Sequence, residues 1–404
     1  MSEWKKEKLG YYVEVLSGFA FKSKDFTSEG VPVIKIKNIS PPNVSLEDLS
    51  YVPMTIVTQN PRYILSRGDV LIAMTGSHIN QIASVVGRVG RIRYDVLSVL
   101  NQRVGKIVNK DDKKSSLDFV YYYLSQYEVK VELAQKAGGA ANQANISPKD
   151  IKDLMFPCPP VETQHRIATI LSRYESLIEN YQKQIKLLEE AAQRLYKEWF
   201  VDLRFPGHEN TNITNGVPEG WEKKSIGEIG EYLNGFAFKP SDWQELGKPI
   251  IKIKEMGNGV TNETPRNSGE RVPAKYLIKA GDLLFSWSAT LMVIIWSGEE
   301  GWLNQHLFKV TPVKGIDREF LLQSISNTIV EFQNLTTGST MKHIQRNKLD
   351  QVFVNVPNAE IMKRYSDISE KTRSNILSLQ SQLRLLTEAR NRLLPKLMSG
   401  AIIH

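Results

Sequence analysis

The chain has 404 residues, 41% of them hydrophobic and 24% charged, which suits two or three globular domains. Its single cysteine excludes an internal disulfide and a cysteine-rich zinc cluster, and no apolar run is long enough to span a membrane, so we expect a cytoplasmic protein. The net charge of +8 makes a polyanionic partner plausible.

The first predicted domain opens with the phrase "SGFAFKSKDF" at Ser17 and continues into "VPVIKIKNI". Strict alternation of apolar and charged residues in the latter predicts a strand with Lys35 and Lys37 on one face. In "SRGDVLIAM", Gly68 and Asp69 predict a tight turn leading into a buried strand, because glycine accepts a positive φ and aspartate caps the turn.

Positive charge collects in this part of the chain. Residues 51–110 carry eight Arg or Lys against two acids, whereas residues 151–200 carry seven of each sign. The corresponding part of the second half, residues 248–314, has nine basic and six acidic residues, a weaker bias of the same sign. Any polyanion is therefore expected to meet these segments rather than the long helices.

Two long helices are predicted from heptad spacing, over about 42 and 39 residues or roughly 60 Å each. Each begins just after prolines, and Pro395 should kink the second near its end. Each helix could pack on its own domain, but we favour mutual pairing, antiparallel if the halves are related by a twofold axis. The expected pairing positions are Ile167, Leu171, Tyr174, Ile178, Tyr181, Ile185, Leu188, Leu195, Trp199, Tyr365, Ile376, Leu379, Leu383, Leu386, Leu393 and Leu397.

The second half of the chain repeats the phrases of the first. "NGFAFKPSDW" at Asn234 and "KPIIKIKEM" follow at an offset of 217 residues, "KAGDLLFSW" at 213, "LNQHLFKV" at 203 and the second helix at 198. The stretches between these phrases differ in length and content. A duplicated scaffold with unlike inserts is the simplest interpretation, with residues 204–220 as a linker.

Motifs for catalysis are weak. No phosphate-binding loop is present, and the six histidines lack metal-ligand spacing. "NPRY" at Asn60 resembles the Asn-Pro-Pro-Tyr loop of amino-methyltransferases, and Asp118, Glu128 and Lys130 have the spacing of a metal-dependent nuclease triad. A self-sufficient DNA methyltransferase or nuclease therefore stays open as an alternative, as does a coiled-coil scaffold with no DNA role.

The doubled order of these phrases resembles the specificity subunit of type I restriction-modification enzymes over essentially the full length. The marks are a Trp before each "GFAFK" (Trp4, Trp221), the "P-x-I-K-I-K" and "GD-x-L" phrases, "WSATLMVIIWSGEEGWLNQHLFKV", "PPVETQHRI" and "RLLPKLMSG". One departure is that Gln164 in the first helix start has Met362 as its counterpart, which questions equal packing at the two ends.

The resemblance implies an α+β fold with two pseudo-twofold-related mixed α/β target-recognition domains, each followed by a long helix, the helices pairing as an antiparallel coiled coil. The implied domains are residues 1–158 and 221–356, with the first spacer helix at 159–203 and the second spacer helix and C-terminal tail at 357–404.

The resemblance also implies a non-catalytic subunit that binds double-stranded DNA and reads a bipartite site, one half per domain, with the helices setting the gap. The implied partners are two DNA adenine methyltransferase subunits and the restriction/translocase subunits. S-adenosylmethionine, ATP and Mg²⁺ would belong to those partners, and no metal or cofactor is expected in this chain.

Candidate DNA contacts divide by whether both halves share them, because phosphate contacts fix register and base contacts carry sequence. The shared candidates are Lys35, Lys37, Lys252 and Lys254. Unshared candidates are Ser77, His78, Asn80, Gln81, Arg88, Arg91 and Arg103 in the first half, and Trp287, Ser288, Thr290 and His306 in the second. Two loops before the helix starts add Asn142, Gln143, Ser339 and Lys342.

Overall fold

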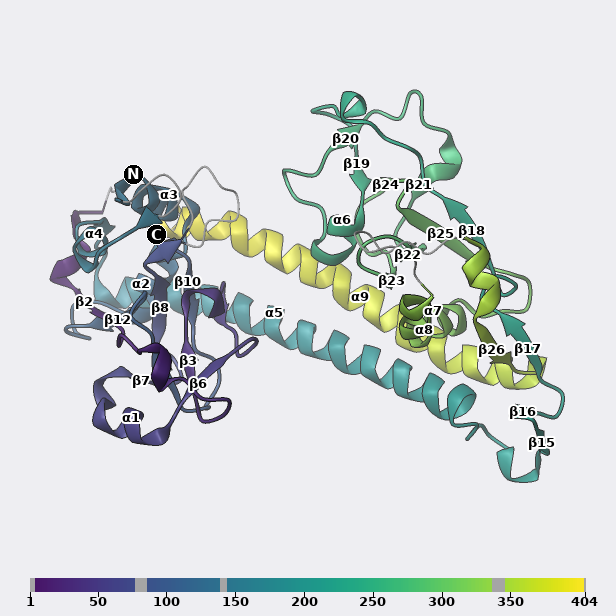
Figure 1. Ribbon diagram of the computed structural model, residues 1–404. Coiled ribbons are helices and arrows are strands. Elements are labelled where there is room, and N and C mark those ends of the chain that lie inside the picture. The colour runs from purple at the N-terminus through teal and green to yellow at the C-terminus, as the bar shows by residue number, and fades with distance from the viewer. Residues whose placement is uncertain (1–3, 77–85, 139–143, 336–345, 403–404) are drawn as a thin grey trace. The chain divides into compact units, whose positions relative to one another are not determined.

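The computed structural model describes residues 4–76, 86–138, 144–335 and 346–402 (Figure 1). Contacts divide the chain into unit 1, Met1–Leu177 with Leu386–His404, and unit 2, Ile178–Leu385. The division passes through both long helices, so each unit contains part of each. None of the helices in the described ranges is long and apolar enough to cross a membrane.

Unit 1 is built on two sheets. One has the order β2 (Val13–Ser17), β12 (Val104–Asn109), β8 (Val70–Ala73), β10 (Val89–Arg91), β5 (Asn43–Val44), β4 (Ile39–Ser40), and the other β6 (Ser50–Val52), β3 (Val31–Ile34), β11 (Ser98–Leu100), β7 (Ile64–Leu65). Two further pairs are β1 (Lys6–Lys8) with β14 (Met155–Pro157) and β9 (Thr75–Gly76) with β13 (Ala144–Asn145). The short helices are α1 (Met54–Gln59), α2 (Leu117–Leu124), α3 (Tyr127–Lys136) and α4 (Pro148–Lys152).

Unit 2 repeats the strand order of the second sheet and of the first four strands of the first sheet. Its sheets have the orders β18 (Gly230–Asn234), β25 (Leu307–Pro312), β22 (Leu283–Ser286), β23 (Met292–Ile295) and β20 (Arg266–Asn267), β19 (Lys248–Ile251), β24 (Gly301–Leu303), β21 (Leu277–Ile278). The pairs are β17 (Glu222–Ser225) with β26 (Phe353–Val356) and β15 (Ile213–Thr214) with β16 (Val217–Pro218), and the helices are α6 (Ile253–Asn258), α7 (Arg318–Asn327) and α8 (Ile329–Asn334). Both β3–β11 and β19–β24 are parallel. The predicted α+β class and internal repeat are confirmed.

The repeated "GFAFK" phrase interlocks with the repeated "LNQ" phrase. A Cβ on Gly18 would lie 2.2 Å from the carbonyl oxygen of Asn101, and one on Gly235 would lie 2.1 Å from that of Asn304. The next amide in each phrase donates to the leucine carbonyl before these asparagines, at 2.9 and 2.8 Å. Only glycine permits this backbone approach, which is a physical reason for finding both phrases in both units.

The predicted turn before the buried strand is confirmed in both units. Gly68 and Gly281 have φ of 92° and 93°. Asp69 Oδ2 accepts from the Ser66 amide at 2.8 Å, and Asp282 Oδ2 accepts from the Lys279 amide at 2.8 Å. The glycine conformation and the aspartate cap therefore both follow the sequence pattern.

The alternating "IKIK" strands are shorter than predicted. Strand β3 ends at Ile34 and β19 at Ile251, and the chain then turns into a 3₁₀ helix at Ile36–Asn38 and into α6. In each unit a polar side chain three residues on accepts from the backbone amide of the first lysine, Asn38 for Lys35 and Glu255 for Lys252. This local capping competes with the strand, so the lysines do not share a strand face as predicted.

The long helices are α5 (Val161–Tyr196), extended by a π turn at Lys197–Val201, and α9 (Ala359–Met398), which runs on through Pro395. In unit 1 the start of α5 packs with the end of α9, as Ile167 and Leu397 show. In unit 2 the end of α5 packs with the start of α9, where the rings of Trp199 and Tyr365 are 6.0 Å apart. The pairing is therefore antiparallel, and all sixteen predicted positions are buried or half-buried.

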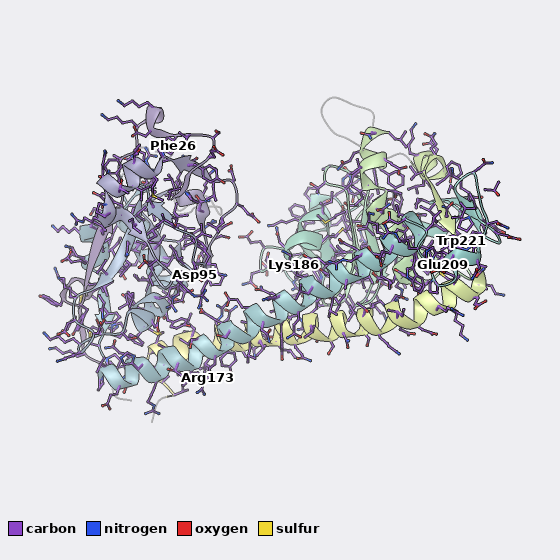
Figure 2. The ribbon with its side chains drawn as sticks, turned by 90° about the horizontal axis from the view of Figure 1, so that it is seen from below. Phe26, Asp95, Arg173, Lys186, Glu209 and Trp221 are labelled. Carbon is purple, nitrogen blue, oxygen red and sulfur yellow. The ribbon has the colours of Figure 1, made fainter. Side chains whose placement is uncertain are left out.

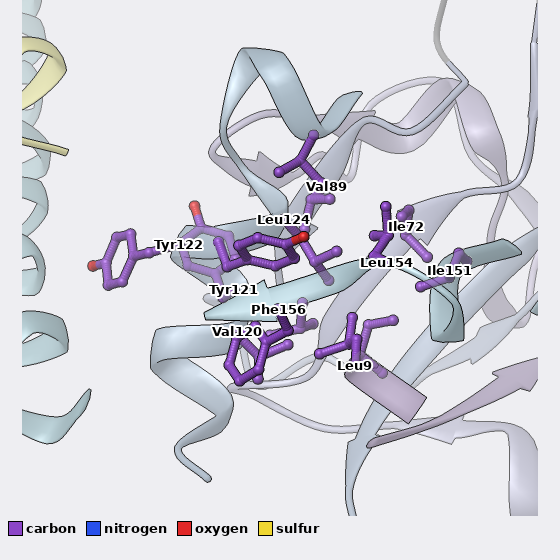
Figure 3. Close-up of a cluster of buried hydrophobic side chains, with 14 of the residues drawn as sticks. Leu9, Ile72, Val89, Val120, Tyr121, Tyr122, Leu124, Ile151, Leu154 and Phe156 are labelled. Carbon is purple, nitrogen blue, oxygen red and sulfur yellow. The ribbon is translucent and has the colours of Figure 1, made fainter. Parts of the chain in front are cut away.

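The core of unit 1 draws on the whole length of the chain. Figure 3 shows Tyr121 and Tyr122 of α2 beside Val89 of β10 and Phe156 of β14. The last turns of α9 join the same core through Leu397 and Met398. In unit 2 the end of α5 has the equivalent place, with Tyr196, Trp199 and Phe200 buried. The end of α9 thus completes the core of unit 1, and the end of α5 completes the core of unit 2.

The two helix starts are anchored differently, in line with the doubt raised by Met362. Gln164 is fully buried; its Oε1 accepts from the Ser116 amide (2.9 Å) and its Nε2 donates to the Pro159 carbonyl (3.0 Å). Met362 instead lies in the apolar core of unit 2. There the contact to the adjoining helix is made by the hydroxyls of Ser366 and Ser369, which donate to the Asp317 carboxylate at 2.9 and 3.2 Å.

Candidate nucleic-acid interface

In both units the first shared lysine lies against an aromatic ring. Lys35 Nζ lies 4.1 Å from the centre of the Phe26 ring, and Lys252 Nζ lies 4.5 Å from that of Trp243. Burial, and then the charge of Lys37, lower the pKa of Lys35. Figure 2 shows Phe26 at the end of unit 1 opposite Arg173 of α5. Each cation–π pair therefore helps to hold its lysine against the neighbouring ring.

The other two shared lysines form exposed ion pairs, Lys37 with Asp48 and Lys254 with Glu263 at 3.4 Å. Exposed pairs of this kind contribute little to stability and exchange partners easily. Their ammonium groups therefore remain available to a phosphate backbone, and the four shared positions stay predictions for DNA contact.

In unit 1 three segments meet at one edge: the end of β8, the turn between β11 and β12, and the residues after β13. The Met74 amide, at the end of β8, donates to the Arg103 carbonyl (3.0 Å) in the turn between β11 and β12. The Ile146 amide, after β13, donates to the Met74 carbonyl (2.9 Å), and β13 pairs with β9. Arg103 is exposed and Arg88 half-exposed. Of the candidates in the described residues, Arg103 and Arg88 thus lie beside the end of β8, where the Ala73 amide donates to the Arg88 carbonyl at 2.9 Å.

Unit 2 builds the same edge with other residues. The Trp287 amide, at the end of β22, donates to the His306 carbonyl (3.5 Å) in the turn between β24 and β25. The Trp287 and His306 rings are 5.8 Å apart, and Trp287 Nε1 donates to Asn234 Oδ1 (3.2 Å). His306 and Thr290 are exposed. Because Arg103 and His306 occupy equivalent turns, the shared frame presents unlike side chains at one place, as the sequence predicts for readers of different DNA.

Two candidates lie in the interior. Arg91 is 6% exposed, with its guanidinium 4.3 Å from the Tyr121 ring and 2.8 Å from Asp118 Oδ1. Ser288 is 4% exposed. Their positions contradict direct base contact in this conformation, because a buried guanidinium committed to a ring and a carboxylate cannot reach a groove. The remaining candidates, Ser77, His78, Asn80, Gln81, Asn142, Gln143, Ser339 and Lys342, lie outside the described residues.

Sequence comparison of the halves overlooked two further features. Gln102 and Gln305 lie in the same turns as Arg103 and His306. Because both belong to the repeated "LNQ" phrase, they were assigned to the common scaffold and not to the candidate DNA contacts. The second feature is an ion pair between the capping aspartate of each turn and a lysine of the neighbouring strand, β12 or β25: Lys106 Nζ lies 2.6 Å from Asp69 and Lys309 Nζ 2.8 Å from Asp282. The signal was present, since "GD" and the lysine recur in both halves.

The two weak catalytic patterns are occupied by structural contacts. Asn60 Nδ2 donates to the Ile56 carbonyl (2.9 Å), and the Tyr63 ring lies 5.5 Å from the Phe19 ring. Asp118 pairs with Arg91 from α2, whereas Glu128 belongs to α3. Among the described residues, no group of three or more His, Cys, Asp or Glu side chains is arranged to hold a metal ion.

Known proteins place the chain in a family. The family model described as type I restriction modification DNA specificity domain matches residues 1–190 and 218–384. The MjaIX specificity subunit of a Methanocaldococcus jannaschii type I restriction enzyme is 25% identical over 321 residues, 75% of this chain and 72% of the relative. The MjaVIII specificity subunit from the same organism is 23% identical over 358 residues, 85% of this chain and 81% of the relative.

A solved structure shares the fold over nearly the whole length. The crystal structure of the S subunit of a type I restriction-modification system from M. genitalium superposes with a TM-score of 0.59 at 16% identity, covering 98% of this chain and 96% of that one. The family model matches both halves, and the duplicated topology is present in both units. The chain therefore belongs to the family of type I restriction-modification specificity subunits.

Proposed function

We propose that this chain is the non-catalytic subunit that gives a type I restriction-modification complex its DNA sequence specificity, each unit reading one half of a bipartite site. The observation that carries the proposal is the repeated edge: one frame, built from the same backbone contacts, presents Arg103 in one unit and His306 in the other. Duplicated readers with unlike side chains suit a site with two unlike halves.

Charge and geometry support this role. The excess of basic residues falls in the recognition units, and counterion release from DNA phosphates would supply most of the affinity. Half-sites read on one face of a duplex are separated by about 34 Å or a multiple of it, and paired helices are stiff enough to fix such a distance. Binding should therefore weaken steeply with salt and require one spacing of the half-sites.

The catalytic steps belong to partners in this proposal. Two DNA adenine methyltransferase subunits would dock on the helices and supply S-adenosylmethionine chemistry, and restriction/translocase subunits would use ATP and Mg²⁺. A self-sufficient enzyme is the alternative, and incubation of the pure chain with DNA, labelled S-adenosylmethionine and Mg²⁺ separates the two: methylation or cutting by the chain alone would refute the proposal.

The direct test of function is methylation mapping in a genome that encodes this chain. Deletion of its gene should remove adenine methylation from one split motif and leave other methylation unchanged. An unchanged methylation pattern, in cells that express the partner subunits, would refute the assignment of DNA specificity to this chain.

A further inference from the structure

Unit 2 contains a cavity of about 330 Å³ where α5 and α9 meet α7 and β23. One wall is apolar and comes from Val293, Ile294 and Ile295 of β23 together with Ile376 and Leu377 of α9. The rest of the lining includes charged and amide side chains from α5, α7 and α9. A cavity of this size, apolar on one side with a few polar groups on the other, has the composition of a small-molecule site.

The duplication identifies which residues of unit 1 correspond to this lining. Arg91 pairs with Val70 in β10–β8, and Ile295 pairs with Leu283 in β23–β22, so Ile295 is the counterpart of Arg91. Helices α2 and α7 both follow an N-cap residue, Ser116 and Asp317. Counting from these caps makes Glu319 the counterpart of Asp118, and Leu322 and Gln323 the counterparts of the two tyrosines Tyr121 and Tyr122.

In unit 1 the corresponding space is filled. The Arg91 guanidinium pairs with Asp118 (2.8 Å) and lies 4.3 Å from the Tyr121 ring and 6.0 Å from the Tyr122 ring. Tyr121 and Tyr122 of α2 are both drawn in Figure 3 and are each 1% exposed. Unit 2 has an isoleucine, a leucine and a glutamine at these positions. At these three positions unit 2 therefore has neither the two tyrosine rings nor a cation, which leaves room for the cavity.

The carboxyl group that Asp118 provides in unit 1 is present in unit 2 as Glu319. Glu319 is 4% exposed, and its Oε1 accepts from Gln323 Nε2 at 2.7 Å. In the described part of the chain no cationic side chain lies within ion-pair distance of Glu319. Burial raises the pKa of Glu319, and burial also raises that of Glu189, which lines the same cavity. The charge of Arg373, which lines the same cavity, opposes the effect of burial on Glu319 without forming an ion pair with it, and Glu189 is exposed at the rim.

Two further polar atoms of the lining have no hydrogen-bond partner among the described residues. Gln380 Oε1 is a buried acceptor without a donor, and Arg373 Nη1 is a buried donor without an acceptor. Arg373 Nη2 lies 3.9 Å from Glu370. The charged groups of the described lining are thus two carboxyls and one guanidinium, a set that favours a cation over an anion.

We propose that this cavity binds a small planar organic cation, an amidinium or guanidinium on an apolar body. The cation takes the place beside Glu319 that the Arg91 guanidinium has beside Asp118. Its N–H groups donate to Glu319 and to Gln380 Oε1, and its flat apolar face lies against Ile294 and Ile295. A ligand bound there links α7 to α5 and α9, since Glu189 and Gln380 belong to those helices.

Benzamidine is a suitable probe, with benzamide as its neutral analogue of nearly the same shape. Calorimetric titration of the full chain should show one saturable site for benzamidine with a dissociation constant of about 1 mM or tighter. Benzamide should bind at least about tenfold more weakly, because it carries no positive charge to form an ion pair with Glu319. Absence of saturable benzamidine binding, or equal binding of benzamide, would overturn the proposal.

Three variants locate the site. Glu319→Gln should weaken benzamidine binding about tenfold or more, and Ile295→Arg should abolish it, since the new guanidinium fills the cavity as Arg91 does in unit 1. Asp118→Asn is the matched control in unit 1 and should leave the affinity unchanged. Benzamidine affinity unaltered by Glu319→Gln, in a variant whose circular dichroism spectrum shows that it is folded, would place the binding elsewhere and refute the assignment.

Discussion

Substitution of Leu397 by alanine tests whether the end of α9 is part of the core of unit 1. Leu397 is 3% exposed and packs in the cluster that contains Leu9 and Phe119, far from it in sequence. Leucine-to-alanine changes at such sites cost about 2–5 kcal/mol through lost burial and the cavity left behind. We expect about 3 kcal/mol, which lowers the protection of α2 amides against hydrogen exchange roughly a hundredfold.

The measurement is hydrogen exchange with peptide resolution on the full chain, comparing Leu397→Ala with Leu385→Ala. Leu385 is on the same helix but 54% exposed, so its truncation should cost less than about 0.5 kcal/mol. The reasoning is refuted if residues 119–124 keep their protection in Leu397→Ala, because the helix end would then contribute nothing to the unit 1 core.

Three further predictions concern the frame. Burial raises the pKa of Glu319 in the folded state, so the folded chain binds this proton more tightly than the unfolded chain does. The unfolding free energy should therefore fall as pH rises from about 4.5 through the raised pKa. Urea titrations at a series of pH values measure this dependence, and Glu319→Gln should remove it. Gly18→Ala and Gly235→Ala should each lower the unfolding free energy by about 2 kcal/mol or more, since the new Cβ meets a backbone carbonyl oxygen at 2.2 or 2.1 Å. Gly138→Ala is the control, because its Cβ would have nothing within 4 Å, and it should change the unfolding free energy by less than about 0.5 kcal/mol. Equal effects of all three substitutions would contradict the interlocking of the two phrases. Gln164→Met introduces the residue found at the other helix start and should lower the unfolding free energy by about 1–3 kcal/mol, because the Ser116 amide and the Pro159 carbonyl lose this partner. An unchanged thermal midpoint would show that these hydrogen bonds do not contribute to stability.

Features set by local patterns could be predicted from the sequence. Heptad spacing identified both long helices and their buried positions, and the "GD" phrases identified two turns with the glycine conformation and aspartate cap that they have. Repetition of phrases along the chain predicted repetition of topology, because equal local choices at equal spacings give equal strand pairings.

Features set by contacts between distant segments could not be predicted from the sequence. Alternation in "IKIK" suggested a strand through both lysines. The strand ends earlier, because a polar side chain three residues after the first lysine accepts a hydrogen bond from its amide and starts a helical turn. Arg91 has the composition of a base-reading residue, yet the Tyr121 ring and Asp118 hold it inside the domain. Nothing local in the sequence distinguishes it from Arg103, which is exposed in a turn. The convergence of the β8, β11–β12 and β13 segments likewise depends on sheet pairing across the unit.

The division of labour between the two units is tested most directly by selecting DNA from a random library with the chain assembled with its methyltransferase subunits. The wild-type complex should recover a motif with two unlike halves at one fixed gap. Arg103→Ala should relax preference in one half and His306→Ala in the other, because equivalent turns of the two units carry these side chains. A single continuous motif, or both variants altering the same half, would contradict the account.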